Sequence, residues 1–533
     1  MTPDVKVIVI FKTLTLVLLI GGGGAAGCRH LPQEGDTRVD VARDFLTQAA
    51  DAIRLVGDEG DRGRLIYDLA PDEAKLGDVN GAKLTASTCA NYEQRADTYQ
   101  FIAEIQEGLG DIAGAKATFE LAKSAAESAH PTNKDALAYT CIEDVAIAQA
   151  RMGDFQAAAA TLQLVPDAAR REFDQGIMAP FHTEEEARKI LANFKDSLNR
   201  DLTISAIAER KAQAGDLAGA SAVACEVVDL NLRTSTYIDI ARAAASKGNT
   251  NGARRAYAQA RKTAEEFRQW WVTEESSNTM AMAISNNGDT EFGAIVAGQT
   301  ENCDDIEGAK AIVPLFRRPV ARAEALVRIA RAQSKAGDPA AARTMLAEVV
   351  KVRASAVDSY GFMQELAVAL ADAGDLPEAM KTVSLMKEEG EPRAHTWEGI
   401  IDVLLDRKDI EGARKLVACI SDARWQATSL ARIAAAEWLA GKTAAARKTF
   451  AEARAVTATV PEKPPTPWAY DRAGIYSSVA MKQAETGDFG EIKRWVPLIP
   501  DPRDRANCWL GAAYPIVKQF YAENRKRPNG PRP

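Results

Sequence analysis

The stretch Tyr237–Ala260, YIDIARAAASKGNTNGARRAYAQA, decides the fold of this chain because it reads as two helices folded back on each other. Apolar residues follow helical spacing on both sides of its midpoint, at Ile240, Ala241, Ala253, Tyr257 and Ala260. Between them, Gly248 can adopt the left-handed conformation that ends a helix, and the side chain of Asn249 can cap the next helix. The stretch therefore predicts a helix-turn-helix unit.

The same unit recurs along the chain when the sequence is aligned on the turn residue. The aligned turn residues are Gly77, Gly110, Gly153, Gly215, Gly248, Gly288, Gly337, Gly374, Lys408, Gly441 and Gly487. Asp follows the turn residue in nine of these eleven cases, and most copies carry Ala seven residues before the turn and five residues after it. Because small residues at the contact let two helices approach closely, these spacings predict an all-α array of helix pairs.

The pattern resembles the tetratricopeptide repeat, which has a small residue in its first helix, Gly-Asp at the turn, and Ala, an aromatic residue and Ala in its second helix. The second-helix positions are matched by Phe119 and Ala122, Tyr257 and Ala260, and Phe450 and Ala453. The early aromatic of the first helix is matched by Tyr99, Tyr237, Trp397 and Tyr476. The resemblance implies a right-handed α-solenoid of about eleven units over residues 45–520. Unequal spacing between the turns leaves a more generic α-solenoid open.

Residues 1–28 have the features of an export signal, with an apolar core at Thr13–Ile20 between a basic start and small residues. Cys28 follows Ala25-Ala26-Gly27, which resembles the cleavage box of bacterial lipoproteins, although Ala25 stands where that family usually has Leu. This segment predicts export to the cell envelope and a lipid anchor on Cys28, with residues 29–44 as a tether. An ordinary cleaved signal with an incidental Cys28 stays open.

Three insertions and a tail interrupt or follow the repeats. Residues 166–200 contain a charged helix that begins at Thr183, with Glu186 placed for a capping box. Residues 303–319 look like an extra half-unit, and the Pro-rich residues 456–468 are predicted to form a loop. Cys508–Lys518 resembles a first helix and is predicted to cap the array, and residues 521–533 have the composition of a disordered tail.

Composition and motifs argue against several classes of function. The net charge of −8 argues against nucleic-acid binding. The sequence contains no Cys-x-x-Cys, His-Glu-x-x-His or Gly-x-Ser-x-Gly motif, so it predicts no metal, no cofactor and no enzymatic activity. The predicted function is an exported, membrane-tethered scaffold that binds a protein or peptide. The alternatives are an envelope enzyme or its accessory subunit, and a purely structural envelope component.

The resemblance also implies where a partner binds, because the concave surface of tetratricopeptide arrays is lined by the first helices. Fixed offsets before each turn select Glu104, Glu107, Glu143, Glu209, Arg242, Arg331, His395, Glu398, Asp402, Asp406 and Trp438. This mostly acidic set predicts a basic or amphipathic partner segment, with Trp438 as a candidate aromatic anchor.

Overall fold

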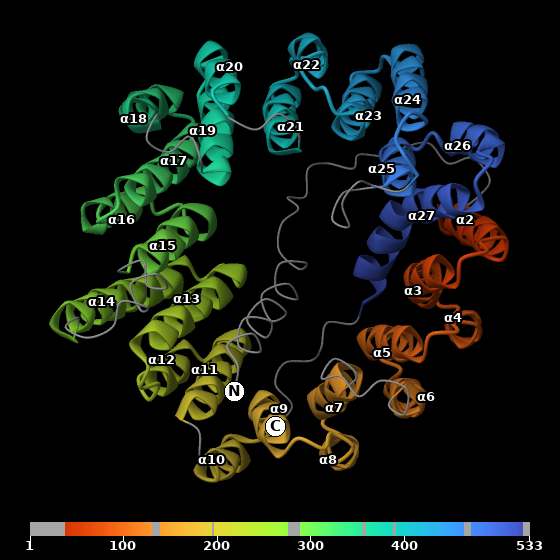
Figure 1. The fold of residues 1–533 in the computed structure, drawn as a ribbon. Coiled ribbons are helices and arrows are strands. Elements are labelled where there is room, and N and C mark those ends of the chain that lie inside the picture. The colour runs from red at the N-terminus through yellow and green to blue at the C-terminus, as the bar shows by residue number, and fades with distance from the viewer. Residues whose placement is uncertain are drawn as a thin grey trace. The chain divides into compact units, whose positions relative to one another are not determined.

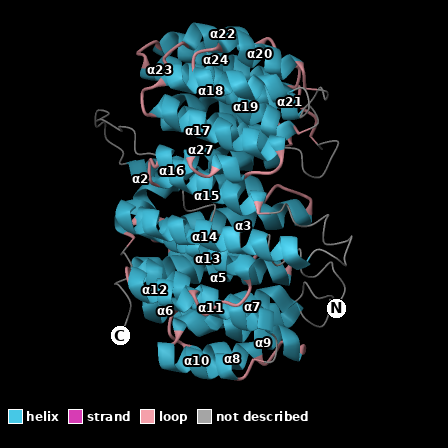
Figure 2. Cartoon of the chain, turned by 90° about the vertical axis from the view of Figure 1, so that its left-hand side faces the viewer, coloured by secondary structure: helices cyan, strands magenta, loops and turns pink. Residues whose placement is uncertain are grey.

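The computed structural model describes residues 38–129, 139–194, 197–274, 288–353, 359–386, 391–462 and 471–525. Within these ranges the regular structure is helical, as Figure 2 shows, and no strand occurs. None of the helices in the described ranges is both long enough and apolar enough to span a bilayer. The all-α fold predicted from the sequence is confirmed.

The unit around Gly248 folds as predicted. Helix α13 (Leu230–Ser246) ends just before Gly248, whose φ of 73° is left-handed, and α14 (Thr250–Glu274) follows. The side chain of Asn249 accepts a hydrogen bond from the N–H of Gly252 at 2.9 Å, which caps α14. The five apolar positions of this unit are each at most 1% exposed.

All eleven aligned turn residues adopt positive φ values, between 63° and 97°. Ten of them are glycine, and Lys408 holds the same conformation with a side chain. Where Asp or Asn follows, its side chain usually accepts a hydrogen bond from the backbone N–H three residues on, as at Asp111, where the distance to Gly114 N is 2.9 Å. Asp488 instead accepts from Arg447 at 2.8 Å. The turn is therefore a local device of one left-handed residue followed by a helix cap.

The helices pair in sequence. The pairs are α3 (Glu59–Lys75) with α4 (Val79–Ser87), α5 (Tyr92–Leu109) with α6 (Ile112–Ala129), α7 (Thr140–Arg151) with α8 (Phe155–Leu162), α9 (Ala168–Met178) with α10 (Glu184–Ala192), α11 (Ser197–Ala214) with α12 (Leu217–Ala224), α13 with α14, α15 (Asp289–Asn302) with α16 (Ile306–Lys310), α17 (Pro319–Lys335) with α18 (Pro339–Val352), α19 (Tyr360–Asp372) with α20 (Leu376–Ser384), α21 (Glu391–Asp406) with α22 (Ile410–Val417), α23 (Ala423–Leu439) with α24 (Thr443–Thr457), and α25 (Arg472–Glu485) with α26 (Phe489–Trp495).

Each first helix contacts the first helices of the pairs before and after it. Together these helices form the first-helix layer, and the second helices follow one another on its other side (Figure 1). The small residues predicted at the helix contacts are buried there, for example Ala103 and Ala115, which are both fully inaccessible.

The prediction of a pair-forming turn at Gly288 is wrong. Gly288 precedes α15, and the left-handed residue between α15 and α16 is Asp304, with φ 48°, followed by the cap Asp305. The N–H of Asp305 bonds to the carbonyl of Gln299, six residues back, whereas most of the other caps bond five residues back. One extra residue and the absence of glycine conceal this turn in the sequence. Residues 303–319, predicted to be an extra half-unit, thus include the second helix of this pair.

The insertion at 166–200 contains a complete pair with a different turn. Helix α9 leads through a 3-10 helix, Ala179–Phe181, into α10. The predicted capping box is present: Glu186 N donates to Thr183 Oγ1 at 3.3 Å, and Thr183 N donates to Glu186 Oε2 at 3.2 Å. Because α9 contacts both α7 and α11, the insertion continues the array rather than interrupting it.

The predicted capping role of Cys508–Lys518 is wrong, because these residues belong to α27 (Pro502–Asn524), which pairs with α2 (Arg38–Ile53). Helix α2 packs on α27 as a second helix packs on its first helix. In the sequence, however, α2 precedes all the other pairs and α27 follows them. Phe45 of α2 is fully buried, with its ring centroid 5.2 Å from that of Trp509. Figure 1 shows the two helices, red and blue, side by side. We call α27 and α2 the closing pair.

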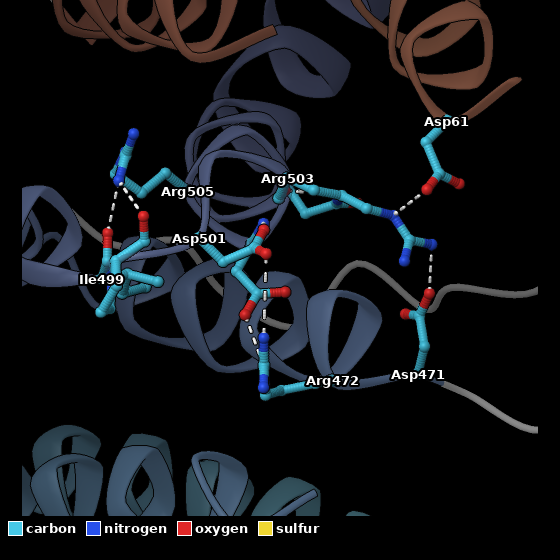
Figure 3. Close-up of polar contacts among 10 residues, drawn as sticks. Asp61, Asp471, Arg472, Ile499, Asp501, Arg503 and Arg505 are labelled. Carbon is cyan, nitrogen blue, oxygen red and sulfur yellow. Dashed lines mark hydrogen bonds and ion pairs between the residues drawn. The ribbon is translucent and has the colours of Figure 1, made fainter. Parts of the chain in front are cut away.

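Ion pairs join the closing pair to its neighbours on both sides. Arg503 at the start of α27 lies between Asp61 of α3, at 3.5 Å, and Asp471, the N-cap of α25 (Figure 3). Arg472 donates to Asp504 at 2.6 Å. Contacts of α27 with both α25 and α3 therefore leave the first-helix layer without a free end.

Several predictions fall wholly or partly outside the described residues. These are the signal segment with Cys28, residues 29–37 of the tether, and residues 463–468 of the loop. Residues 521–524 of the predicted tail belong to α27, and residues 526–533 of it lie outside the described residues. The first helix likewise begins at Arg38, inside the predicted tether.

Candidate interaction surface

All the predicted partner-binding residues lie on first helices. They are Glu104 and Glu107 on α5, Glu143 on α7, Glu209 on α11, Arg242 on α13, Arg331 on α17, His395, Glu398, Asp402 and Asp406 on α21, and Trp438 on α23. The structure thus spreads them over many helices rather than gathering them at one point.

Two of the predicted carboxylates are buried instead of exposed. Glu143 is 8% exposed and pairs with Arg170 at 2.6 Å, and Glu398 is 3% exposed and lies 3.4 Å from Arg432. Thr428 also donates to Glu398, at 2.8 Å. Both glutamates occupy the position ten residues before a turn, which faces the following first helix. Their assignment as exposed groove residues is wrong for this geometric reason.

Arginines of one first helix neutralise acidic residues of a neighbouring one. Arg151 of α7 reaches Glu104 at 3.1 Å and Glu107 at 3.5 Å on α5. Arg328 of α17 lies 3.5 Å from Glu365 of α19. These ion pairs therefore neutralise part of the negative charge that was predicted for the partner-binding surface.

The region of α19, α21 and α23 combines polar and aromatic side chains. The exposed His395 lies 2.9 Å from Gln364 and packs against the ring of Trp425, with centroids 5.0 Å apart. Trp438 is half-buried, with the guanidinium of Arg447 5.7 Å from its ring. Trp438 is thus already engaged by its own second helix.

Most of the remaining predicted residues pair with a nearby side chain, and some of them are exposed while others are partly buried. Arg242 is exposed and lies 3.0 Å from Asp239, and Glu209 accepts from Gln213 at 2.9 Å. The Nε of Arg331 is buried and has no hydrogen-bond partner among the described residues. Asp402 pairs with Arg432, and Asp406 is exposed.

Acidic residues gather on neighbouring first helices, and sequence reasoning predicted only Glu104 and Glu143 among them. We call this group the acidic patch: Asp68 on α3, Asp97 and Glu104 on α5, Glu143 and Asp144 on α7, and Asp174 on α9. Its members are linked electrostatically, because Tyr67 of α3 interacts with the carboxyls of Asp97, Asp68, Asp144 and Glu104, and Asp174 interacts with Glu143 and Asp144. The ring of Tyr67 meets that of Phe101 edge-on, with centroids 5.3 Å apart.

Desolvation and repulsion by nearby carboxylates raise the pKa values of Asp68, Asp174 and Tyr67. The side chain of Asp68 is exposed, but desolvation by the surrounding helices and the charge of Asp72 raise its pKa to about 6, although Lys75 opposes the shift. Burial, together with Glu143, raises the pKa of Asp174 to about 8, although Arg170 opposes the shift. Burial and the nearby aspartates raise the pKa of Tyr67 to about 12. Raised pKa values mean that these carboxyls lack full compensation for their charge.

Asp174 is the most constrained member of the acidic patch. It is 3% exposed, and its Oδ2 is buried and has no hydrogen-bond partner within the described part of the chain. A buried carboxylate oxygen without a donor is costly, which favours a cation or a donor supplied from outside the described residues.

A repeated offset could have located part of the acidic patch from the sequence. Asp68, Asp144 and Asp239 each lie nine residues before their turn, one position away from the buried offset of Glu143 and Glu398. A shift of one residue rotates a side chain by about 100° around a helix, so the choice of offset decides which face is selected.

No protein-family model matches the chain. No curated protein matches it either. Many solved structures match the chain, among them the following three, each at low identity. Ton1535 from Thermococcus onnurineus NA1 is 14% identical, with 67% of this chain and 98% of that one covered and a TM-score of 0.23. A circular tandem repeat protein with a novel repeat topology is 12% identical, with 91% and 97% covered and a TM-score of 0.18. The structure of Naa15/Naa10 bound to HypK-THB is 13% identical, with 91% and 87% covered and a TM-score of 0.25.

Proposed function

We propose that this chain is an exported, membrane-tethered scaffold that binds a basic segment of another protein along its first-helix layer, at the acidic patch. The observation that carries the proposal is Asp174, a buried carboxyl with one oxygen that receives no hydrogen bond from the described residues and that lies within electrostatic range of Glu143 and Asp144. A guanidinium or ammonium group supplies a hydrogen-bond donor for this oxygen. It also supplies a positive charge that stabilises the ionised form of the carboxyl.

The gathering of carboxyl groups on neighbouring first helices supports a basic ligand. The patch places six carboxyl groups on α3, α5, α7 and α9, and Arg151 and Arg170 pair with two of them. The adjacent aromatic pair of Tyr67 and Phe101 offers ring surface on which an arginine or lysine side chain can stack.

Binding of a defined basic probe tests this proposal. We expect a fluorescein-labelled tetra-arginine peptide to bind the purified full chain, with affinity that falls steeply as salt rises, because the contact is electrostatic. The double variant D68N/D144N should bind the peptide roughly ten-fold more weakly, since a factor of ten corresponds to about 1.4 kcal/mol.

The matched control is D51N/D406N, which removes the same charge at two exposed aspartates outside the patch. It should bind the peptide like the wild type, and thermal unfolding should show that all three proteins are folded. Equal affinity of the patch and control variants, or no binding of the peptide at all, would remove the acidic patch as a binding site.

The tether belongs to the same proposal and rests on the sequence around Cys28. Lipidation attaches the chain to a membrane, so the wild type should fractionate with membranes and C28A should be unprocessed or mislocalised. A mature soluble protein whose first residue is not Cys28 would exclude the lipid anchor.

A further inference from the structure

Two neighbouring turns of the array depart from the common pattern, and each departure introduces a lysine. Lys408 stands in place of the left-handed glycine between α21 and α22, with a φ of 63° that side chains rarely adopt. Lys442 stands in place of the capping Asp between α23 and α24, and it provides no side-chain cap for α24. Both departures weaken the local structure, which favours a role for these lysines beyond folding.

An exposed apolar side chain lies next to these lysines. Leu439, at the end of α23, is 84% exposed, the highest value among the large apolar side chains of the described residues. Only two small residues separate it from Lys442, and the half-buried Trp438 precedes it. We call Lys408, Trp438, Leu439 and Lys442 the leucine tip.

The two turns of the leucine tip carry more positive than negative charge. Neither lysine forms an ion pair within the described part of the chain. Residues 406–409 and 439–442 contain the cations Arg407, Lys408 and Lys442 and the carboxylates Asp406 and Asp409, all of them exposed. Asp409 is also engaged as the cap of α22, where it accepts from the backbone N–H three residues on at 2.8 Å.

The leucine tip lies at the edge of the array where the first helices end, which we call the turn edge. Neighbouring first helices run in the same direction, because residues at similar distances from their turns meet. Ser334 Oγ donates to the carbonyl of Asp372 at 2.6 Å, and Arg151 lies 3.5 Å from Glu107. These four residues are each two or three positions before their turns, so the turns lie side by side.

Helix α2, which leads to the N-terminus, begins at the turn edge. Its first residue, Arg38, lies 3.5 Å from Gln519 near the end of α27. The hydroxyl of Tyr521 would in turn be 2.3 Å from a Cβ added at Gly108, two residues before a turn. Ten residue steps lead from Arg38 back to Cys28, and they span at most about 36 Å. A lipid anchor on Cys28 therefore favours an orientation in which the turn edge faces the membrane.

We propose that the leucine tip is a second membrane contact, in which Leu439 enters the headgroup region of an anionic bilayer and Lys408 and Lys442 bind lipid phosphates. The inference rests on the proposed function, because the lipid anchor on Cys28 supplies the orientation. An exposed leucine with a tryptophan and flanking lysines is typical of surfaces at a membrane interface. The start of α2 at the same edge and the positive charge select an anionic membrane as the occupant.

Photo-crosslinking in vesicles tests the inference. The lipidated chain is reconstituted into vesicles of phosphatidylethanolamine and phosphatidylglycerol, with a benzophenone amino acid in place of Leu439 or, as the matched control, of Leu498. Leu498 is 78% exposed, but it lies just before α27 and therefore at the opposite edge. We expect several-fold more lipid adduct at position 439 than at position 498.

Restoring the common turns should reduce this contact. The variant K408G/K442N supplies a glycine and a capping residue like Asn249. It should lower the lipid adduct at position 439 several-fold, while it melts at the same temperature as the wild type or at a higher one. The matched control K415Q/K448Q removes two exposed lysines from α22 and α24 and should leave the adduct unchanged.

The outcomes separate this inference from the proposed function. Equal lipid adducts at the two positions, adducts of position 439 with protein alone, or an unchanged yield in K408G/K442N would exclude the leucine tip as a membrane contact, and the lipid anchor would stand. If the wild type carries no lipid on Cys28, the anchor fails and the inference fails with it.

Discussion

At the scale of the residue, Asp174 lowers the free energy of unfolding of the array. The unfolded chain releases its carboxyl proton near the ordinary aspartate value of about 4. In the folded protein, desolvation and the neighbouring Glu143 raise its pKa to about 8. The folded state therefore keeps a proton that the unfolded state loses, and this carboxyl lowers the free energy of unfolding as the pH rises from about 4 to about 8.

Replacing Asp174 by Asn should remove this pH dependence. We expect D174N to be more stable than the wild type, with a difference that widens between pH 5 and pH 8 by an amount on the order of 1.4 kcal/mol per pH unit at most. Urea unfolding at pH 5, 6.5 and 8 measures the difference. D406N, at an exposed aspartate, should show a constant difference over the same range. A difference for D174N that stays constant or narrows would contradict the raised pKa.

At the scale of the elements, polar side chains join the two helices of a pair in a repeated way. Gln106, four residues before its turn, accepts from Thr118, eight residues after it, at 2.6 Å. The same offsets join Gln149 to Thr161 at 2.7 Å. These buried hydrogen bonds fix the rotation of one helix against the other, because an unpaired buried amide or hydroxyl is costly.

A second repeated contact joins several pairs to the pair before them. Arg95, near the start of α5, donates to the carbonyl of Cys89 at 2.8 Å, and Arg233 of α13 donates to Val227 at 2.7 Å. Each arginine lies fifteen residues before its turn and reaches six residues back. The charged donor satisfies a carbonyl in the link between pairs, which has no partner in a helix.

At the scale of the whole array, the closing pair makes the two ends of the chain interdependent. A linear array of repeats has independent ends, because each unit contacts only its neighbours. Here α2 completes the core around Trp509, and Lys493 of α26 pairs with Asp44 at 2.8 Å. Loss of α2 therefore exposes apolar surface on α27 and on its neighbours.

Replacing Phe45 by Ala tests this coupling. The ring is fully buried between Trp509 and Phe489, so its loss should cost about 3–5 kcal/mol. Hydrogen exchange should lose protection in α2 and α27 together, despite their separation in sequence, and keep it in α17 and α18. The matched control is F450A, which removes a fully buried ring from α24 and should affect the region around α23 and α24 instead. Loss of protection in α2 alone would show that α27 does not depend on the closing pair.

The sequence by itself determined the helices, their turns and most of their pairing, because these depend on contacts between residues close in the chain. A left-handed glycine, a capping Asp and two small residues suffice to form a unit, as at Gly110 and Asp111. The tertiary structure alone decided the turn at Asp304, the burial of Glu398 and the pairing of α27 with α2. It also decided which acidic residues meet, since the stacking of α7 and α9 brings Asp144 and Asp174 within electrostatic range of each other. Such long-range contacts depend on the exact rotation and spacing of every helix between them, and no local pattern records that geometry.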